Sequence, residues 1–297
     1  MLAGRLDTFG NEAYRVFIHA RWPVQSYVIL GFLFGAIITK TPISLEMVVA
    51  TIAWLFLVAG LTVFNSYYDK DDVEVGGMQH PPKVTPSLLY GSLIMLGVGL
   101  TLSLFINLTF FSMAFLTGFI YFFYSYEGTR WKSNGYAAVS INAIVGSLTV
   151  LAAASLGKTW LSPEVILAAI TAALFKASVY TMMQVHQIAE DKKRGDTSVA
   201  VRHGRAVTLR FAQVTMLVSG LFAIAAVYIM MSGAMLLPIL TALYFLAGGA
   251  LFEVWIRQND DPAKDAARMQ RMIYFTGYAG SVTFLAIYIL LNVQGVI

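Results

Sequence analysis

The sequence predicts an all-α membrane protein that crosses the bilayer nine times. The prediction rests on the composition, on the spacing of apolar runs and on the distribution of basic residues. Of the 297 residues, 58% are hydrophobic and 12% are charged, and the mean hydropathy is +0.70. Soluble globular domains are much less apolar. The composition therefore indicates a polytopic membrane protein.

Apolar runs long enough to span a membrane recur along the whole chain. A helical span needs about 20 mostly apolar residues. We expect spans near residues 24–39, 45–66, 87–107, 109–125, 136–156, 164–184, 208–231, 234–256 and 271–291. Only Asn107 separates the third run from the fourth. The chain does not open with the pattern of a cleaved signal peptide, so the first span is expected to serve as the targeting signal.

The basic residues predict the orientation of these spans. Alternating the loops between two sides places 17 of the 20 Lys and Arg residues on the side of the N-terminus. Lys40 and Lys158 fall on the other side, and Lys176 falls inside the sixth run. Cytoplasmic loops carry such an excess of Lys and Arg. We therefore expect a cytoplasmic N-terminus and a C-terminus on the opposite side. The pI of 9.2 then reflects basic residues that orient the spans, and we expect no nucleic-acid partner.

An acidic cluster at residues 65–74 follows the second span. If the helix continues through it, Asn65, Asp69 and Asp72 stack at i, i+4 and i+7 on one face. Carboxylate and amide oxygens suit a hard divalent cation such as Mg²⁺, which is commonly shared with the oxygens of a phosphate substrate. The cluster is thus a candidate metal site.

A second cluster at residues 184–196 follows the sixth span in the same way. On a helix, Gln187, Glu190 and Asp191 also share a face. The two clusters lie at the same end of the predicted bundle, four spans apart. Two facing clusters of this kind predict a site for a metal-bound diphosphate, although a transporter path or a structural role is also compatible with acids near a membrane.

Several other polar residues have two interpretations. Arg130 and Lys132, which follow the aromatic run 121–126, fit either a diphosphate clamp or an ordinary basic loop. Arg21 is either an interfacial anchor or a residue of the substrate mouth, and Lys176 either snorkels or reaches a pocket. Gly31 and Gly35 match a helix-packing motif. The chain has no cysteine, which excludes disulfides and thiolate chemistry.

At the two clusters the sequence resembles the UbiA superfamily of intramembrane prenyltransferases. The first motif of that family is Asn-x-x-x-Asp-x-x-x-Asp, in which Asn65 and Asp69 match and Val73 stands at the third position. On a continuous helix, Asp72 lies about 20° from the face of Asn65 and Val73 about 80°. Asp72 is therefore the expected substitute for the third aspartate, and Asp71 would take that role only if the helix ends earlier.

The second motif of the family is Asp-x-x-x-Asp. Here Gln187 and Asp191 occupy its two positions, and Glu190 is expected to supply the missing charge. The segment 194–204 resembles the one that follows this motif. Tyr124 with Arg130 and Lys132 resembles the family's loop after the fourth span, and Lys83 its basic loop after the second.

The resemblance implies one prenyltransferase domain over residues 1–297, with nine helices around a central cavity that opens to the lipid. It implies Mg²⁺-dependent transfer of a prenyl group from an isoprenyl diphosphate to a lipophilic acceptor, often aromatic and similar to a quinone precursor. A nonaromatic lipid acceptor is the alternative. The implied metal ligands are Asn65, Asp69, Asp72, Glu190 and Asp191; Lys83, Arg130 and Lys132 would bind the diphosphate; Asp69, Asp191 and Tyr124 would act in catalysis.

Overall fold

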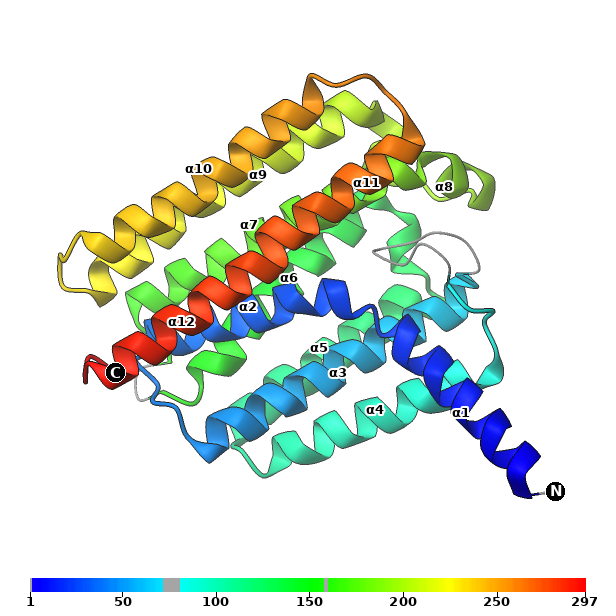
Figure 1. The fold of residues 1–297 in the computed structure, drawn as a ribbon, viewed down its shortest axis with the longest axis horizontal. Coiled ribbons are helices and arrows are strands. Elements are labelled where there is room, and N and C mark those ends of the chain that lie inside the picture. Colours follow the sequence, from blue (N-terminus) through cyan, green and yellow to red (C-terminus); the bar gives the residue numbers. More distant parts are fainter. Residues whose placement is uncertain (1, 72–80, 158–159) are drawn as a thin grey trace.

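The computed structural model describes residues 2–71, 81–157 and 160–297, with side chains from residue 10 onward. Within these ranges the regular structure is helical, apart from a single bridge between Asn134 and Thr197. The α-helices, shown in Figure 1, are α1 (Leu2–His19), α2 (Trp22–Ile38), α3 (Leu45–Asp69), α4 (Pro86–Leu104), α5 (Leu108–Ser125), α6 (Gly135–Ala154), α7 (Pro163–Gln184), α8 (Ile188–Arg194), α9 (Val199–Met230), α10 (Leu236–Ile256), α11 (Pro262–Met272) and α12 (Gly280–Val293). Short 3₁₀ helices occur at Trp131–Ser133 (η1) and Val185–Gln187 (η2), and a π-helical segment, Ile273–Ala279 (η3), joins α11 to α12.

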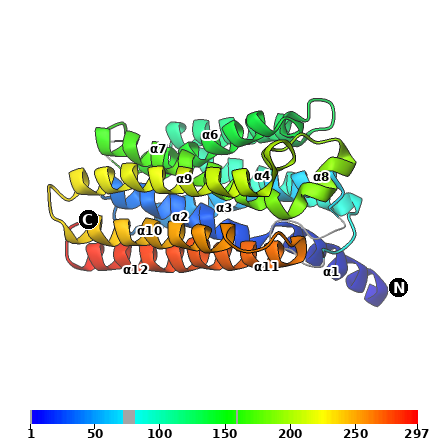
Figure 2. The same ribbon diagram turned by 90° about the horizontal axis from the view of Figure 1, so that it is seen from above.

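The long helices confirm the all-α membrane fold. In the described residues, eight helices are long and apolar enough to cross a bilayer, or nine if α1 and α2, which are bent by 53° at their junction, are taken as one span. The predicted apolar runs correspond in order to α2, α3, α4, α5, α6, α7, α9, α10 and the continuous stretch from α11 to α12. The protein is an integral multi-pass membrane protein. Figure 2 shows the helices lying alongside one another as a bundle.

Short polar and proline signals set the helix ends. The Asn107 side chain accepts a hydrogen bond of 2.7 Å from the backbone N–H of Phe110, and so caps α5. Ser44 caps α3 in the same way through Met47, at 3.1 Å. Proline occupies the first turn of α4, α7 and α11, where its missing N–H costs no helical hydrogen bond. Asn107 therefore separates two spans, as the sequence indicated.

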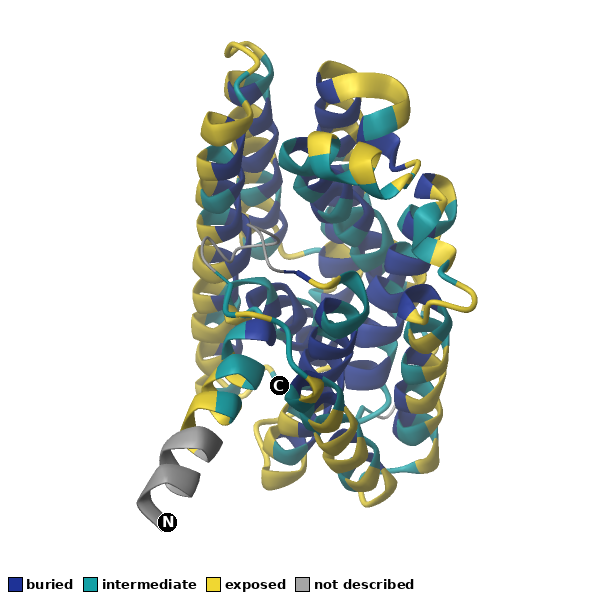
Figure 3. Ribbon diagram, turned by 90° about the vertical axis from the view of Figure 1, so that its right-hand side faces the viewer, coloured by how far each residue is buried: buried dark blue, intermediate teal, exposed yellow. Residues whose placement is uncertain are grey.

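The centre of the bundle is closely packed around α2, which contacts α3, α6, α7 and α12. A Cβ on Gly35 would lie 2.6 Å from the carbonyl oxygen of Val150, and one on Gly31 would lie 3.3 Å from the Thr149 side chain. Only small residues permit this approach of α2 to α6, which confirms the packing role predicted for both glycines. Figure 3 shows buried residues on the inner faces of the helices and exposed ones on the outer faces.

Two connections meet at the end of the bundle where α3 and α7 end, which we call the acidic end. The backbone N–H of Thr197, between α8 and α9, donates to the carbonyl oxygen of Ser133 at 3.0 Å. The N–H of Gly135 donates to the carbonyl oxygen of Thr197 at 3.1 Å. These bonds tie the connection that follows α5 to the connection that follows the second acidic cluster. The two segments therefore lie side by side at the acidic end.

Candidate active site

A polar cavity lies at the acidic end of the bundle. Its volume is about 1180 Å³, including its open mouth. Helices α2, α3, α5, α6 and α7, together with η1, η2 and α8, contribute to its walls. Both predicted clusters reach it, with the polar lining Arg21, Asn65, Asp69, Asp71, Lys132, Gln187, Asp191 and Arg194. The structure therefore joins two segments that are more than a hundred residues apart in sequence.

The first cluster differs from the expected helical arrangement. Helix α3 ends at Asp69, and Lys70 adopts a left-handed backbone conformation with φ of 52° as its C-cap. The premise that the helix continues through Asp72 is therefore wrong, and Asp72 itself lies outside the described residues. Because the chain turns at Lys70, Asp71 faces the cavity and is fully buried. Asp71 thus takes the place in the cavity that the helical argument gave to Asp72.

Asp71 is surrounded by cationic groups. Its Oδ2 forms an ion pair with Arg21, and its Oδ1 lies 3.9 Å from Nη1 of Arg194. Arg21 also donates a hydrogen bond of 3.0 Å to the Ser66 hydroxyl. Burial raises the pKa of the Asp71 carboxyl, and the Arg21 guanidinium opposes that rise. Of the two interpretations of Arg21, the structure supports a cavity residue, and the break between α1 and α2 places it there.

Asp69 and Lys132 form the second ion pair in the cavity, and both side chains are largely buried. The Lys132 ammonium lies 5.9 Å from the ring centroid of Tyr124, a cation–π distance. Burial lowers the pKa of this ammonium, and the Asp69 carboxylate opposes the change. The Tyr124 hydroxyl donates to the Tyr180 hydroxyl at 3.0 Å. Three residues from the sequence prediction, Asp69, Tyr124 and Lys132, thus meet in one part of the cavity.

The second cluster enters the cavity only in part. Gln187, in η2, and Asp191, in α8, line it. Glu190 does not line it, and its carboxylate lies 3.5 Å from Arg194 and 3.7 Å from Lys193. From the first cluster, Asn65 also lines the cavity.

Two of the predicted diphosphate ligands lie away from the cavity lining. The Lys83 side chain is exposed, and its carbonyl oxygen accepts a hydrogen bond of 3.0 Å from Arg15. Arg130 lies 3.0 Å from Asp196, a residue whose own side chain lines the cavity. Arg130 therefore contacts a residue of the lining without lining the cavity itself, whereas Lys132 lines it.

The oxygen donors of the cavity fit a hard divalent cation. Asp69, Asp71 and Asp191 supply carboxylates, and Asn65 and Gln187 supply amide oxygens, the ligand types that Mg²⁺ takes. Oδ1 of Asp71 is buried without a hydrogen-bond partner. Nevertheless, across the ranges that the structure covers, no three acidic, histidine or cysteine side chains form a preassembled metal group. Lys132 instead forms an ion pair with Asp69, and Arg21 forms one with Asp71.

Sequence reasoning missed a row of residues on one face of α7. Tyr180 and Gln184 line the cavity together with Gln187. The Tyr121 hydroxyl, on α5, donates to Oδ1 of Asn142 at 2.7 Å, and both residues also line the cavity. The polar residues that line the cavity from α7 and η2 are Lys176, Tyr180, Gln184 and Gln187. They recur at intervals of three or four, the helical period, which was the available signal.

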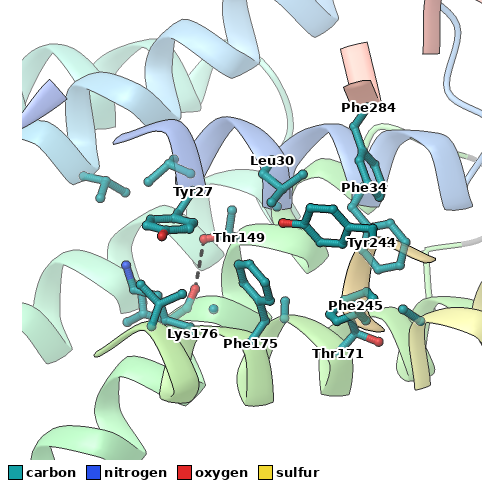
Figure 4. A pocket seen from close by; sticks show the side chains of 18 residues that line it. Tyr27, Leu30, Phe34, Thr149, Thr171, Phe175, Lys176, Tyr244, Phe245 and Phe284 are labelled. Atoms are coloured by element: carbon teal, nitrogen blue, oxygen red, sulfur yellow. Dashed lines mark hydrogen bonds between the residues drawn. The ribbon is translucent and has the colours of Figure 1, made fainter. Parts of the chain in front are cut away.

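An apolar cavity adjoins the polar one within the bundle. Its volume is about 740 Å³, and both cavities share the lining residues Val28, Val58, Lys176 and Val179. Figure 4 shows its walls, in which aromatic side chains from α2, α7, α10 and α12 face one another.

An acid-lined cavity thus adjoins an aromatic, apolar cavity within the helical membrane bundle. The sequence profile of the UbiA prenyltransferase family matches residues 27–277, so the chain belongs to this family and is a prenyltransferase. A comparison with curated proteins finds no match.

Solved structures show the same fold. A UbiA homolog from Archaeoglobus fulgidus bound to GPP and Mg²⁺ superposes with a TM-score of 0.68 at 20% identity, covering 94% of this chain and 99% of the other. Digeranylgeranylglyceryl phosphate synthase gives a TM-score of 0.63 at 16% identity, with coverages of 93% and 99%. A UbiA homolog from Aeropyrum pernix K1 gives 0.63 at 16% identity, with coverages of 88% and 98%. The resemblance stated from the two motifs is thus confirmed.

Proposed function

We propose that this prenyltransferase binds an isoprenyl diphosphate with Mg²⁺ in the polar cavity and transfers the prenyl group to a lipophilic, aromatic acceptor. The observation that carries the proposal is that a polar and an apolar cavity adjoin and share lining residues. The polar cavity suits the charged diphosphate, and the apolar one suits the prenyl chain. The residues that line both cavities would lie beside the bond between the diphosphate and the prenyl chain.

The side chains of the polar cavity have distinct proposed roles. Asn65, Asp69, Asp71, Asp191 and Gln187 are the ligands available to Mg²⁺, and Asp71 replaces Asp72 in this set. When bound, the ion would neutralise charge that develops on the departing diphosphate. Glu190 is left out of the set, because its carboxylate faces Arg194 and Lys193 rather than the cavity.

Basic residues would bind the diphosphate oxygens directly. Lys132, Arg21 and Arg194 line the cavity, and each now contacts a carboxylate. When diphosphate and cation enter together, the carboxylates gain a new cation and the basic side chains gain a new anion. Exchange of partners then keeps every buried charge paired. Lys83 and Arg130 do not line the cavity, so they would contribute at most to the electrostatic potential around it.

The transfer itself needs no side-chain nucleophile. The bond between the first prenyl carbon and the diphosphate oxygen breaks, and its electron pair leaves with the diphosphate. An electron pair of the acceptor forms the new bond to the prenyl carbon, and the acceptor releases one proton. The rings of Tyr124 and Tyr180 line the polar cavity, where an aromatic face stabilises positive charge on the prenyl group.

A transporter is the rival interpretation. Transporter acids usually lie near the bilayer midplane, whereas Asp69 is the last residue of α3 and Asp191 follows the end of α7. We further propose that the acidic end faces the cytoplasm, on the ground of the positive-inside distribution.

The proposal is tested with purified protein in detergent, labelled prenyl diphosphates of several lengths and a lipid extract that contains candidate acceptors. We expect labelled prenyl product with Mg²⁺ and none with EDTA, and loss of the product in Asp69→Ala and Asp191→Ala. Asp260→Ala is the matched control, because that side chain is 76% exposed. Near-normal turnover in either cavity variant, with Mg²⁺ supplied, would falsify the two-cluster site.

A further inference from the structure

The apolar cavity is bordered by a continuous series of aromatic rings, which we call the aromatic belt. The belt begins and ends on α2 and passes through α7, α10 and α12. Successive ring centroids are 5.2–6.2 Å apart and every contact is edge to face, in the order Tyr27, Phe175, Phe245, Tyr244, Phe284 and Phe34. Edge-to-face pairs at this spacing stabilise one another. The belt is therefore a packed wall of the cavity.

Hydrogen bonds fix two rings of the belt to η3. The Tyr244 hydroxyl donates to the carbonyl oxygen of Thr276 at 2.6 Å, and the Tyr27 hydroxyl lies 2.7 Å from the Thr276 hydroxyl. Phe34 and Phe245 are buried, with 6% of each residue exposed. Packed and hydrogen-bonded rings cannot swing aside without losing these contacts. The position of the wall is thus set by the fold.

The contact between Phe34 and Phe284 closes the cavity where α2 meets α12. Hydrogen bonds join the two sides both before and after this contact. The Ser281 hydroxyl donates to the carbonyl oxygen of Ser26 at 2.7 Å. The Tyr288 hydroxyl donates to a backbone carbonyl of the connection that follows α2, also at 2.7 Å. Figure 4 shows Lys176 toward one end of the cavity, with Phe34 and Phe284 gathered at the other.

The distance between these two ends defines the depth of the cavity. Val28, at the boundary with the polar cavity, precedes Phe34 by six residues of α2, or about 9 Å. On α7, Val179 at the same boundary and Thr171 are eight residues apart, or about 12 Å. A prenyl unit adds four carbon–carbon bonds of about 1.5 Å to a chain, or about 5 Å when extended. The cavity is therefore about two prenyl units deep.

We propose that the aromatic belt limits the donor to the length of a geranyl chain, with Phe34 and Phe284 as the residues that exclude a third prenyl unit. This inference rests on the proposed function, since it takes the apolar cavity as the site of the prenyl chain. A longer chain must displace a packed ring, which carries the cost of overpacking a core. The double bonds of a prenyl chain do not rotate, so the chain has little freedom to fold into a shorter form.

The test measures how affinity depends on donor length. GPP, farnesyl diphosphate and geranylgeranyl diphosphate are titrated with Mg²⁺ into the purified protein. We expect the wild type to bind GPP at least about tenfold more tightly than geranylgeranyl diphosphate. Phe284→Ala should remove this preference and change GPP affinity only a few-fold, because the chain end can then pass α12 into the surrounding lipid or detergent. Leu285→Ala is the matched control, since Leu285 is 45% exposed and does not line the cavity.

A second variant covers the case in which Phe284→Ala does not fold. Phe284→Leu keeps an apolar side chain opposite Phe34, and it should weaken the preference for GPP to a smaller extent. Binding of geranylgeranyl diphosphate to the wild type as tightly as GPP would overturn the inference, and so would a wild-type preference that persists in both variants. Failure of the wild type to bind GPP with Mg²⁺ would instead contradict the proposed function itself.

Discussion

The substitution Asp71→Asn tests whether Asp71 completes the first motif. The change preserves the size of the side chain and removes its charge. Asp71 is fully buried, with Arg21 in contact and Arg194 at 3.9 Å. If Asp71 is a ligand of the metal-diphosphate complex, the variant loses both a buried ion pair and a metal ligand.

The structure sets the magnitude of each effect. Removing one partner of a buried ion pair costs about 3–5 kcal/mol. We expect the lower end of this range, because Arg21 keeps its hydrogen bond to Ser66 and lies at an open cavity. Loss of one carboxylate from the shared metal site should lower turnover by about a hundredfold, equivalent to about 2.7 kcal/mol of barrier.

A double variant separates the two effects. In Arg21→Met with Asp71→Asn both charges of the pair are absent, so stability should recover at least partly. Turnover should not recover, because the ligand is still missing. Folded protein is measured by size-exclusion chromatography after heating in detergent, and turnover is measured with labelled GPP and Mg²⁺. Asp260→Asn is the exposed control. Recovery of turnover in the double variant would refute a ligand role and leave Asp71 as a counter-charge for Arg21.

Three further predictions concern the second cluster, the packing and the topology. Asp191→Asn should lower turnover by about a hundredfold and Glu190→Gln only a few-fold, since Asp191 alone of the two lines the cavity; the reverse order in a GPP turnover assay would restore Glu190 to the ligand set. Gly35→Ala should destabilise the bundle by about 1–3 kcal/mol through overpacking, whereas Gly97→Ala, with no atom within 4 Å of the added Cβ, should leave thermal stability unchanged. A reporter at the C-terminus should be extracytoplasmic and one in the loop after α3 cytoplasmic, and a cytoplasmic C-terminus would contradict the nine-span orientation.

The sequence was sufficient to predict the spans, because each depends on local composition. An apolar run of about 20 residues has few alternatives to a membrane helix, and the prolines and the Asn107 cap mark where such runs are divided. Asn65, Asp69, Lys132 and Asp191 were also predictable as cavity residues, since each lies at or near a helix end on the same side of the bundle.

The remaining site residues depend on geometry that no local pattern specifies. Helix α3 ends at Asp69 because Lys70 adopts a left-handed backbone conformation. Lysine does not favour this conformation, and no glycine or proline in the sequence marks the helix end there. Of the adjacent acids Glu190 and Asp191, only Asp191 lines the cavity, a distinction that their spacing on a helix did not make. Arg21 reaches Asp71 only because the chain bends by 53° between α1 and α2.

Calorimetric titration of GPP into the purified protein tests the central claim most directly, because it needs no acceptor. The polar cavity should bind GPP when Mg²⁺ is present and lose most of that affinity in EDTA. Asp69→Asn should reduce the affinity in Mg²⁺ by at least about tenfold, while Asp260→Asn leaves it unchanged. Tight binding that persists in EDTA, or an unchanged affinity in Asp69→Asn, would contradict a metal-diphosphate site built from the two acidic clusters.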